Sequence, residues 1–378
     1  MPEKVTVSLI KADVGSIAGH SRPHPKMLQV ASEMLAKAVL DGLLIDYYVT
    51  RCGDDMQLLM THRNGENHKE VHKVAWDAFL SAAQEAKKMH LYAAGQDLLS
   101  DAFSGNVRGQ GPGAAEMEFI ERPTEPMLVF MADKCGPAAY SLPISKIFMD
   151  PFTTTGLVID PRAHIGYDLE VVDVVDHKSV TMSSPAEMYD ILALLGDTTR
   201  FAVKRVRHRD IGIAAVVSTE KLNMLAGKYV GKDDPVMLVR CQSGLPAVGE
   251  VLQPFAFPQL VAGWMRGSHY GAWYPCSVDE SDPTYHDGPP RVCALGIQIN
   301  NGRIQGVEAP GLRPGEHCPI DYFAGHEWDI VRNKAMEVSM YMRGHGPFMP
   351  GIVAPDELEY TTRPEILKKL EPRMKPLE

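Results

Sequence analysis

Residues 227–240, which read GKYVGKDDPVMLVR, place several reactive side chains within a short stretch of chain. They include a phenol (Tyr229), two lysines and two adjacent carboxylates, Asp233 and Asp234. A lysine amine can form a Schiff base with a ketone, and a tyrosine beside it can move protons. Paired carboxylates bind hard cations such as Mg²⁺. The stretch therefore indicates carbonyl chemistry beside metal-assisted phosphate chemistry, unless it is only a charged surface turn.

Pro235 follows the two acids and precedes the apolar run VMLV. A proline disfavours helical backbone in the residue before it, which predicts an extended Asp234 in a loop that enters a strand. Schiff-base formation needs a neutral amine, whereas lysine has a pKa near 10.4 that neighbouring aspartates raise further. This chemistry alone does not choose between Lys228 and Lys232 as the reactive lysine.

Aspartates recur where apolar runs end, as in VSLIKAD, CGDDMQLLM and MLVFMAD. These aspartates are Asp13, Asp54, Asp55 and Asp133. Carboxylates at strand ends can converge at one edge of a sheet, whereas a single such aspartate is more often a turn or cap residue. Because one context repeats, the pattern favours a shared divalent-metal site with Asp233 and Asp234, which His20 and Gln96 could complete.

The elements that would position these residues are strands and amphipathic helices. Apolar residues at three-to-four spacing predict helices over 24–42, 68–89 and 326–344. Strands are expected at 5–10, 44–50, 56–62, 127–132, 157–160, 169–175, 198–206, 211–218, 236–241 and 292–299. The element order indicates an α/β protein of the α+β type, a four-layer α-β-β-α sandwich with mixed sheets. Without a convincing linker, we expect a single catalytic domain over residues 1–378.

Composition narrows the classes of partner. The 378-residue chain has a net charge of −10, which argues against nucleic acid and would repel an anionic substrate unless cations fill the acidic site. Six scattered cysteines without a CxxC pair suggest a reducing compartment. The N-terminus reads as a strand rather than a signal peptide, and no apolar run approaches the roughly 18 residues of a membrane span. We therefore expect a cytoplasmic protein with no membrane partner.

Six motifs in order resemble one family. They are IKADVGS with GH at 19–20, CGDD, YAAGQDLLSDAFSGN (92–106), GKYVGKDDPV, GWMRGSH (263–269) and EYTT (359–362). Together they resemble the archaeal-type bifunctional fructose-1,6-bisphosphate aldolase/phosphatase family, from about residue 5 to 365. The sequence departs from the family pattern at Cys52, at His286 and in segments 303–328 and 343–351, which bears on nearby loops and subunit contacts.

The resemblance implies a Mg²⁺-dependent enzyme of gluconeogenesis. It would condense dihydroxyacetone phosphate with glyceraldehyde 3-phosphate through a lysine Schiff base, then hydrolyse the 1-phosphate to leave fructose 6-phosphate. The family motif matches Lys232 as the Schiff-base lysine and Tyr229 as the proton donor and acceptor. Two alternatives remain open: a Mg²⁺-dependent sugar phosphatase without aldolase activity, and a non-enzymatic sugar-phosphate or metal-binding protein.

The same resemblance implies the ligands and substrate contacts. The metal ligands, for several Mg²⁺ ions per site, would be Asp13, His20, Asp54, Asp55, Gln96, Asp133, Asp233 and Asp234. The substrate contacts would be Tyr92, Lys134, Gln242, Arg266, Asp287 and Tyr360. Mobile loops are expected around 92–116 and 220–235 and in the C-terminal tail. The resemblance also implies a homo-oligomer, with an octamer as one candidate.

Overall fold

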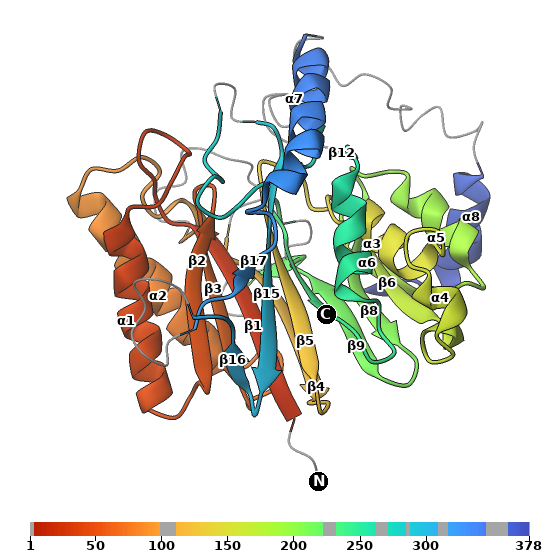
Figure 1. The fold of residues 1–378 in the computed structure, drawn as a ribbon, viewed down its shortest axis with the longest axis horizontal. Helices are drawn as coiled ribbons and strands as arrows, with labels where there is room; N and C mark the ends of the chain where they lie inside the picture. Colours follow the sequence, from red (N-terminus) through yellow and green to blue (C-terminus); the bar gives the residue numbers. More distant parts are fainter. Residues whose placement is uncertain are drawn as a thin grey trace.

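Two β-sheets pack face to face, and helices cover the outer face of each sheet (Figure 1). The computed structural model describes residues 4–98, 111–221, 232–261, 271–284, 288–308, 317–344 and 362–377. Three large clusters of buried apolar side chains separate the layers, one between the sheets and one beneath each helical layer. The expected four-layer α-β-β-α arrangement is confirmed.

The first sheet has five strands in the order β10-β4-β1-β3-β2, and all its neighbours are antiparallel. The strands are β1 (Lys4–Asp13), β2 (Asp46–Cys52), β3 (Asp55–His62), β4 (Gly113–Ile120) and β10 (Glu220–Lys221). Alternation along β1 directs Val7 and Leu9 toward the second sheet, and Ile10 and Ala12 toward the helices. Both faces of this strand are therefore buried.

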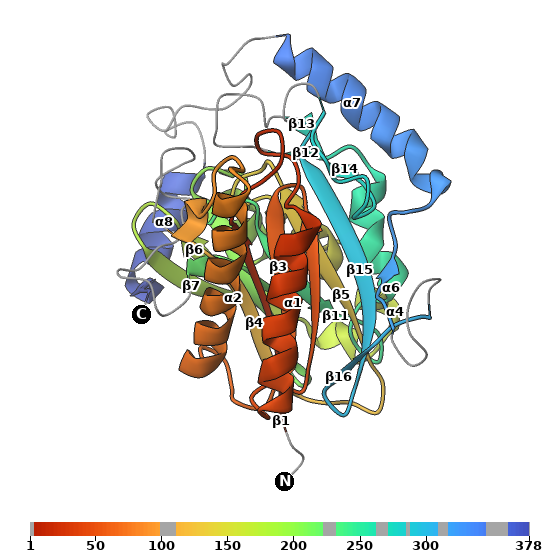
Figure 2. The ribbon, with the colours of Figure 1, turned by 90° about the vertical axis from the view of Figure 1, so that its left-hand side faces the viewer.

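Helices α1 (Pro25–Leu40) and α2 (Lys69–Lys88) cover the outer face of this sheet (Figure 2). Pro25 occupies the first turn of α1, where its missing N–H has no helical partner to lose. The His24 side chain accepts the Lys26 N–H at 3.1 Å and so caps the helix start. The buried face of α2 is rich in alanine, which lets the helix lie close against α1.

The second sheet has the strand order β14-β15-β5-β11-β9-β8-β6-β7-β18, and β16 and β17 also pair with β15. Only β14 and β15 run parallel among the described pairs of this sheet, so it is mixed. Its strands are β5 (Glu125–Asp133), β6 (Tyr167–Asp173), β7 (Lys178–Ser184), β8 (Phe201–His208), β9 (Gly212–Val217), β11 (Val236–Arg240), β14 (Tyr274–Pro275), β15 (Arg291–Asn300), β16 (Arg303–Gln305), β17 (Ile320–Asp321) and β18 (Lys375–Pro376). A separate pair joins β12 (Leu260–Val261) to β13 (Gly271–Ala272).

Short helices cover the outer face of the second sheet (Figure 1). They are α3 (Ser141–Met149), α5 (Met188–Leu195), α6 (Val248–Leu252) and α8 (Arg363–Leu370). Helix α7 (Asp329–Arg343) extends beyond the upper end of the sheets, and it confirms the helix predicted over 326–344. Val331 and Ala335 on the inner side of α7 are buried, whereas Ile330 and Tyr341 on its other side are exposed.

One strand prediction was wrong. Residues 157–160 form most of the short helix α4 (Gly156–Ile159) rather than a strand. The apolar run at 157–159 has only three residues, too few for a periodicity that separates helix from strand. Val158 and Ile159 are also exposed, so no sheet neighbour buries them.

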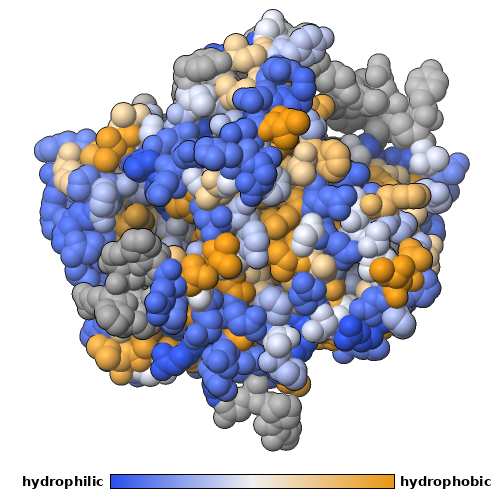
Figure 3. All heavy atoms as spheres, in the orientation of Figure 1, coloured by the Kyte–Doolittle hydropathy of each residue, from blue (hydrophilic) through white to orange (hydrophobic). Residues whose placement is uncertain are grey.

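Apolar side chains at the surface form small, separate patches among hydrophilic residues on the face shown in Figure 3. This pattern is ordinary for a globular protein, because polar groups never cover the whole surface. Among the helices of the described ranges, none combines the length and apolar character needed to span a bilayer.

Candidate metal and Schiff-base site

Strand ends from both sheets meet at one end of the sandwich. In the first sheet, Asp13 closes β1 and lies opposite Asp55, the first residue of β3. In the second sheet, Asp133 closes β5, and Asp234 precedes the neighbouring strand β11. The structure thus brings the strand-end aspartates together, in two groups whose oxygen or nitrogen atoms lie close enough to share a metal ion.

A two-residue turn, Gly53-Asp54, joins β2 to β3 and sets the position of two of these acids. Gly53 has φ +57°, a left-handed conformation that glycine adopts without steric penalty. A Cβ atom at this position would overlap Oδ2 of Asp133. Glycine is therefore required both for the turn and for the approach of Asp133 from the other sheet.

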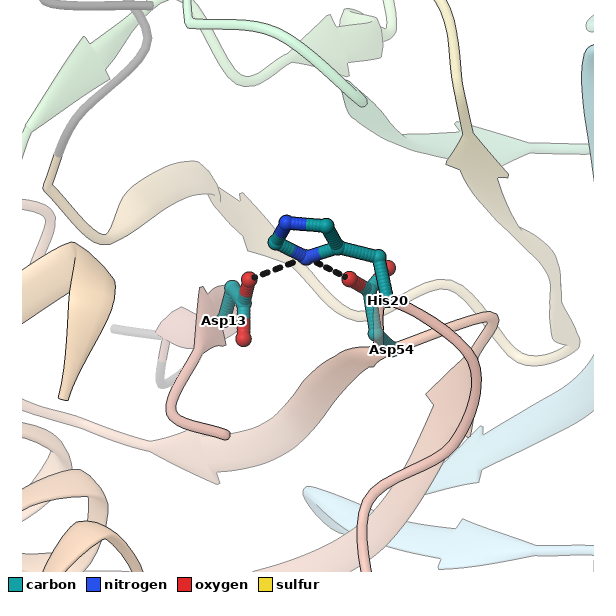
Figure 4. Close-up of side chains that lie close together, drawn as sticks. All are labelled: Asp13, His20 and Asp54. Atoms are coloured by element: carbon teal, nitrogen blue, oxygen red, sulfur yellow. Dashed lines mark hydrogen bonds and ion pairs between the residues drawn. The ribbon is translucent and has the colours of Figure 1, made fainter. Parts of the chain in front are cut away.

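The first group contains Asp13, His20 and Asp54 (Figure 4). The imidazole Nδ1 of His20 lies 2.8 Å from Oδ2 of Asp54 and 3.4 Å from Oδ2 of Asp13. Burial opposes a charge on the ring, but the hydrogen bonds to Asp13 and Asp54 raise the pKa of His20 to about 10. An imidazolium therefore bridges two carboxylates, and His20 would have to lose a proton for Nδ1 to bind a metal ion.

The second group contains Asp55, Asp133 and Asp234. Burial, followed by the nearby carboxylates, raises the pKa of Asp234 to about 7 despite the opposing effect of Lys11. Burial also raises the pKa of Asp55 well above its usual value, although Lys11 opposes that shift. Buried carboxylates this close repel one another, so a divalent cation would stabilise the ionised group.

Cationic side chains already contact these acids. Lys11 donates to Asp55, and Arg291 donates to Oδ2 of Asp133. Lys134 connects the two groups, since its Nζ lies 2.7 Å from Oδ1 of Asp54 and 3.0 Å from Oδ1 of Asp133. Lys134 has φ +64°, an uncommon backbone conformation for a non-glycine residue and one that often marks functional sites.

Lys232 lies beside the second group with its amine buried. Its Nζ donates to Oδ1 of Asp233 at 2.9 Å and to Oδ2 of Asp97 at 3.1 Å. Burial lowers the pKa of Lys232, but the attraction of Asp233 and Asp97 outweighs it, and the net pKa lies above the usual value. In this conformation Lys232 is a charged ion-pair partner rather than a nucleophile.

Asp234 departs from the predicted extended conformation, since its φ is +46°. Two reciprocal hydrogen bonds with Cys135 outweigh the local preference imposed by Pro235. The Cys135 N–H donates to Oδ1 of Asp234 at 2.7 Å, and the Asp234 N–H donates to the Cys135 carbonyl at 2.9 Å. The strand β11 then begins at Val236, as expected.

The other predicted residues differ in how they lie relative to the two groups. Tyr92 packs its ring edge-on to His20, with centroids 5.0 Å apart, so it adjoins the first group. Gln96 begins the short 3₁₀ helix Gln96–Leu98, whose next residue, Asp97, contacts Lys232. Gln242 lies two residues beyond the far end of β11, whose five residues alone span roughly 16 Å. Within one chain, Gln242 is thus remote from the carboxylates.

Several predicted residues fall outside the described part of the chain. They are Tyr229, Arg266, Asp287 and Tyr360, together with the alternative lysine, Lys228. Their roles stay predictions. Parts of the segments expected to be mobile, 99–110, 222–231 and 345–361, lie outside the described residues as well.

Three buried charged residues at the site were not predicted: Lys11, Asp97 and Arg291. Lys11 had a usable signal, since it stands alone among apolar residues two positions before Asp13 and therefore shares a strand face with it. The sequence offers no comparable signal for Asp97 or Arg291. Their contacts depend on pairing with Lys232 and Asp133, which lie 135 and 158 residues away in the sequence.

Comparison with known proteins finds one family over nearly the whole chain. The family model described as fructose-1,6-bisphosphatase matches residues 4–375. A fructose-1,6-bisphosphate aldolase/phosphatase of Ignicoccus hospitalis is 55% identical over 377 residues, covering 100% of this chain and 94% of that protein. Proteins of the same name from Methanothermobacter marburgensis (54% identical, 99% and 100% covered) and Moorella thermoacetica (51%, 99% and 95%) are also similar. The chain belongs to the fructose-1,6-bisphosphate aldolase/phosphatase family.

Proposed function

We propose that this protein is a bifunctional fructose-1,6-bisphosphate aldolase and phosphatase of gluconeogenesis. The observation that carries the proposal is the shared site: one buried lysine, Lys232, donates to Asp233, and the next residue, Asp234, belongs to the second carboxylate group. A lysine suits carbon–carbon bond formation through an imine, and the carboxylates suit metal-assisted phosphate hydrolysis. Relatives covering essentially the whole chain carry both activities in their names.

Mg²⁺ is the proposed metal. Carboxylate oxygens dominate the site, and such hard ligands suit Mg²⁺. The two groups already described would hold it, with Asp233 and Gln96 as further ligands and His20 as the one nitrogen ligand. When bound, Mg²⁺ supplies an activated water and offsets phosphate charge. For the acids to take up metal, His20 must lose its proton, and Lys134 must release Asp54 and Asp133.

Lys134 then becomes available for the substrate. Its amine carries a positive charge at the junction of the two groups, where a phosphate would lie among the metal ligands. An ammonium released from two carboxylates can donate to phosphate oxygens. This supports the predicted role of Lys134 as a substrate contact.

For the aldolase reaction, the neutral amine of Lys232 would attack the carbonyl carbon of dihydroxyacetone phosphate. Protonation of the resulting carbinolamine and loss of water would give the iminium, and proton removal with the help of Tyr229 would give the enamine that attacks glyceraldehyde 3-phosphate. Hydrolysis of the product iminium would then release fructose 1,6-bisphosphate and free the Lys232 amine. Lys232 must leave its ion pairs with Asp97 and Asp233 before it can react. A rearrangement around Lys232 is therefore part of the proposal.

The runner-up is a Mg²⁺-dependent phosphatase without aldolase activity. One observation favours it: Lys232 is ion-paired and buried while Asp234 already joins the second carboxylate group. Borohydride reduction in the presence of dihydroxyacetone phosphate separates the two functions. We expect a triose-phosphate adduct on the peptide containing Lys232, and none in Lys232→Ala. Absence of any adduct, with hydrolysis of fructose 1,6-bisphosphate intact, would establish the phosphatase alone.

We further propose that the protein acts in the cytoplasm as a homo-oligomer, with an octamer as one candidate. All six cysteines are free thiols, in keeping with a reducing compartment. Exposed apolar side chains on α4 and on the projecting helix α7 offer contact surface, among them Ile159, Ile330 and Tyr341. Light scattering of the purified protein would give the mass, and a monomer would refute the oligomer.

A further inference from the structure

The position of Lys232 depends on two residues that no role has yet been given, Asp97 and Gly113. Asp97 is buried, and the backbone N–H groups of Asp13 and Gly111 donate to it at 2.9 and 3.3 Å. Oδ2 accepts from both the Asp13 N–H and the Lys232 amine. The carboxylate is therefore fixed by the backbone and presents its charge to Lys232.

Gly113, the first residue of β4, makes room for the aliphatic part of the same lysine. A Cβ atom built on Gly113 would lie 2.8 Å from Cγ of Lys232, closer than real Cβ contacts allow. Its backbone does not require glycine, because Gly113 is absent from the described glycines with positive φ. The lack of a side chain at Gly113 therefore serves the space that Lys232 occupies.

We propose that Asp97 and Gly113 form a lysine anchor, which holds Lys232 in place during phosphate hydrolysis and releases it for the aldol reaction. The proposal rests on the Schiff-base role proposed for Lys232. In the anchored position the Lys232 amine is buried and ion-paired, while Asp234 lies with Asp55 and Asp133. Both anchor residues are positioning residues, since they act through Lys232 rather than on substrate.

The anchor links the two activities, because it sets the fraction of protein molecules in which Lys232 is held. If the anchored and released arrangements exchange, weakening the anchor lowers the fraction of protein ready for hydrolysis and leaves Lys232 freer to react. Mg²⁺, which binds the carboxylate group of the anchored arrangement, should draw that fraction back. A change that merely damages the fold would lower both activities together.

Two variants weaken the anchor by different means. Asp97→Asn removes the charge but keeps the shape, and Gly113→Ala fills the space occupied by the Lys232 stem. At limiting Mg²⁺, both should hydrolyse supplied fructose 1,6-bisphosphate roughly five- to ten-fold more slowly. Borohydride trapping with dihydroxyacetone phosphate should not fall, and saturating Mg²⁺ should restore most of the hydrolysis.

Matched controls lie away from the site. Asp173→Asn changes a buried aspartate that likewise accepts two backbone N–H groups and pairs with a cation, Arg200. Gly249→Ala adds a methyl group where no atom lies within 4 Å. Both controls should keep the wild-type ratio of trapping to hydrolysis.

A double-mutant cycle tests the space argument without any activity assay. Gly113→Ala should lower the melting temperature of the wild-type protein but not of Lys232→Ala, because that background has no stem to displace. Equal lowering in both backgrounds would overturn the role of Gly113. Unchanged hydrolysis in Asp97→Asn, or parallel loss of hydrolysis and trapping, would overturn the anchor even if Gly113→Ala does not fold. If the wild-type protein itself shows no imine, the Schiff-base role fails instead.

Discussion

Gly53→Ala should disrupt the metal site from a position that supplies no ligand atom. The substituted residue would have to hold φ +57°, which for a residue with a Cβ costs about 1–2 kcal/mol. Its methyl group would also overlap Oδ2 of Asp133, the oxygen that accepts from the buried Arg291. Breaking such a pair costs about 3–5 kcal/mol, so the free energy of unfolding should fall by about 4–7 kcal/mol.

The clash can also be relieved by movement of the turn that carries Asp54 and Asp55. Either movement separates acids that would share a metal, so the Mg²⁺ concentration needed for half-maximal hydrolysis should rise at least ten-fold. Chemical denaturation measures the first effect, and phosphate release over a Mg²⁺ series measures the second.

Gly42→Ala is the matched control for this substitution. Gly42 has φ +78°, but nothing lies within 4 Å of a Cβ built there. In Gly42→Ala the free energy of unfolding should fall only by the backbone contribution of about 1–2 kcal/mol. The variant should keep the wild-type response to Mg²⁺. If Gly53→Ala behaves like Gly42→Ala in both measurements, the close approach of Asp133 does not matter and the reasoning is wrong.

Four further outcomes are expected. His20 carries a proton up to its raised pKa of about 10, so protons compete with metal below that pH. Calorimetry should therefore show Mg²⁺ affinity rising with pH between about 7 and 9. An equally steep rise of Mg²⁺ affinity with pH in His20→Gln would contradict this. In the ion-free protein the same raised pKa stabilises the fold fully below pH 6.5 and loses that effect as pH rises toward 10. Asp54→Ala should abolish hydrolysis and weaken Mg²⁺ binding with the fold retained, whereas unchanged activity at limiting Mg²⁺ would exclude Asp54 as a ligand. Tyr229→Phe should slow aldol condensation most and leave hydrolysis largely intact, while Asp233→Ala should impair hydrolysis most; equal loss of both activities in Tyr229→Phe would refute the division of roles.

The strand-end aspartates could be located from the sequence because their signal is local. An apolar run that stops at an aspartate defines both the strand and the end at which the acid lies, as for Asp13 and Asp133. The same pattern gave the turn at Gly53, where two apolar runs flank CGDD. Mutual proximity then followed once the strands were placed in facing sheets.

The counterions could not be located in this way, because their partners are distant in sequence. The register that sets Arg291 opposite Asp133 arises only when β15 and β5 pair. The strand predicted at 157–160 failed for a related reason, since a short apolar run takes the structure its neighbours allow. The conformation of Asp234 likewise reflects tertiary contacts with Cys135 that outweigh the preference before a proline.

The cations that contact the carboxylates should affect the stability of the fold when no metal is bound. Seven carboxylates at the site would repel one another on their own: Asp13, Asp54, Asp55, Asp97, Asp133, Asp233 and Asp234. Five cationic side chains contact acids of this set and offset the repulsion: Lys11, His20, Lys134, Lys232 and Arg291. Many small metalloproteins unfold when chelated because only the ion holds their ligands together. Here cationic side chains of the chain itself contact the carboxylates, so the protein should stay folded but inactive when Mg²⁺ is removed. Circular dichroism after chelation should show the native spectrum, and simple readdition of Mg²⁺ should restore phosphate release without refolding.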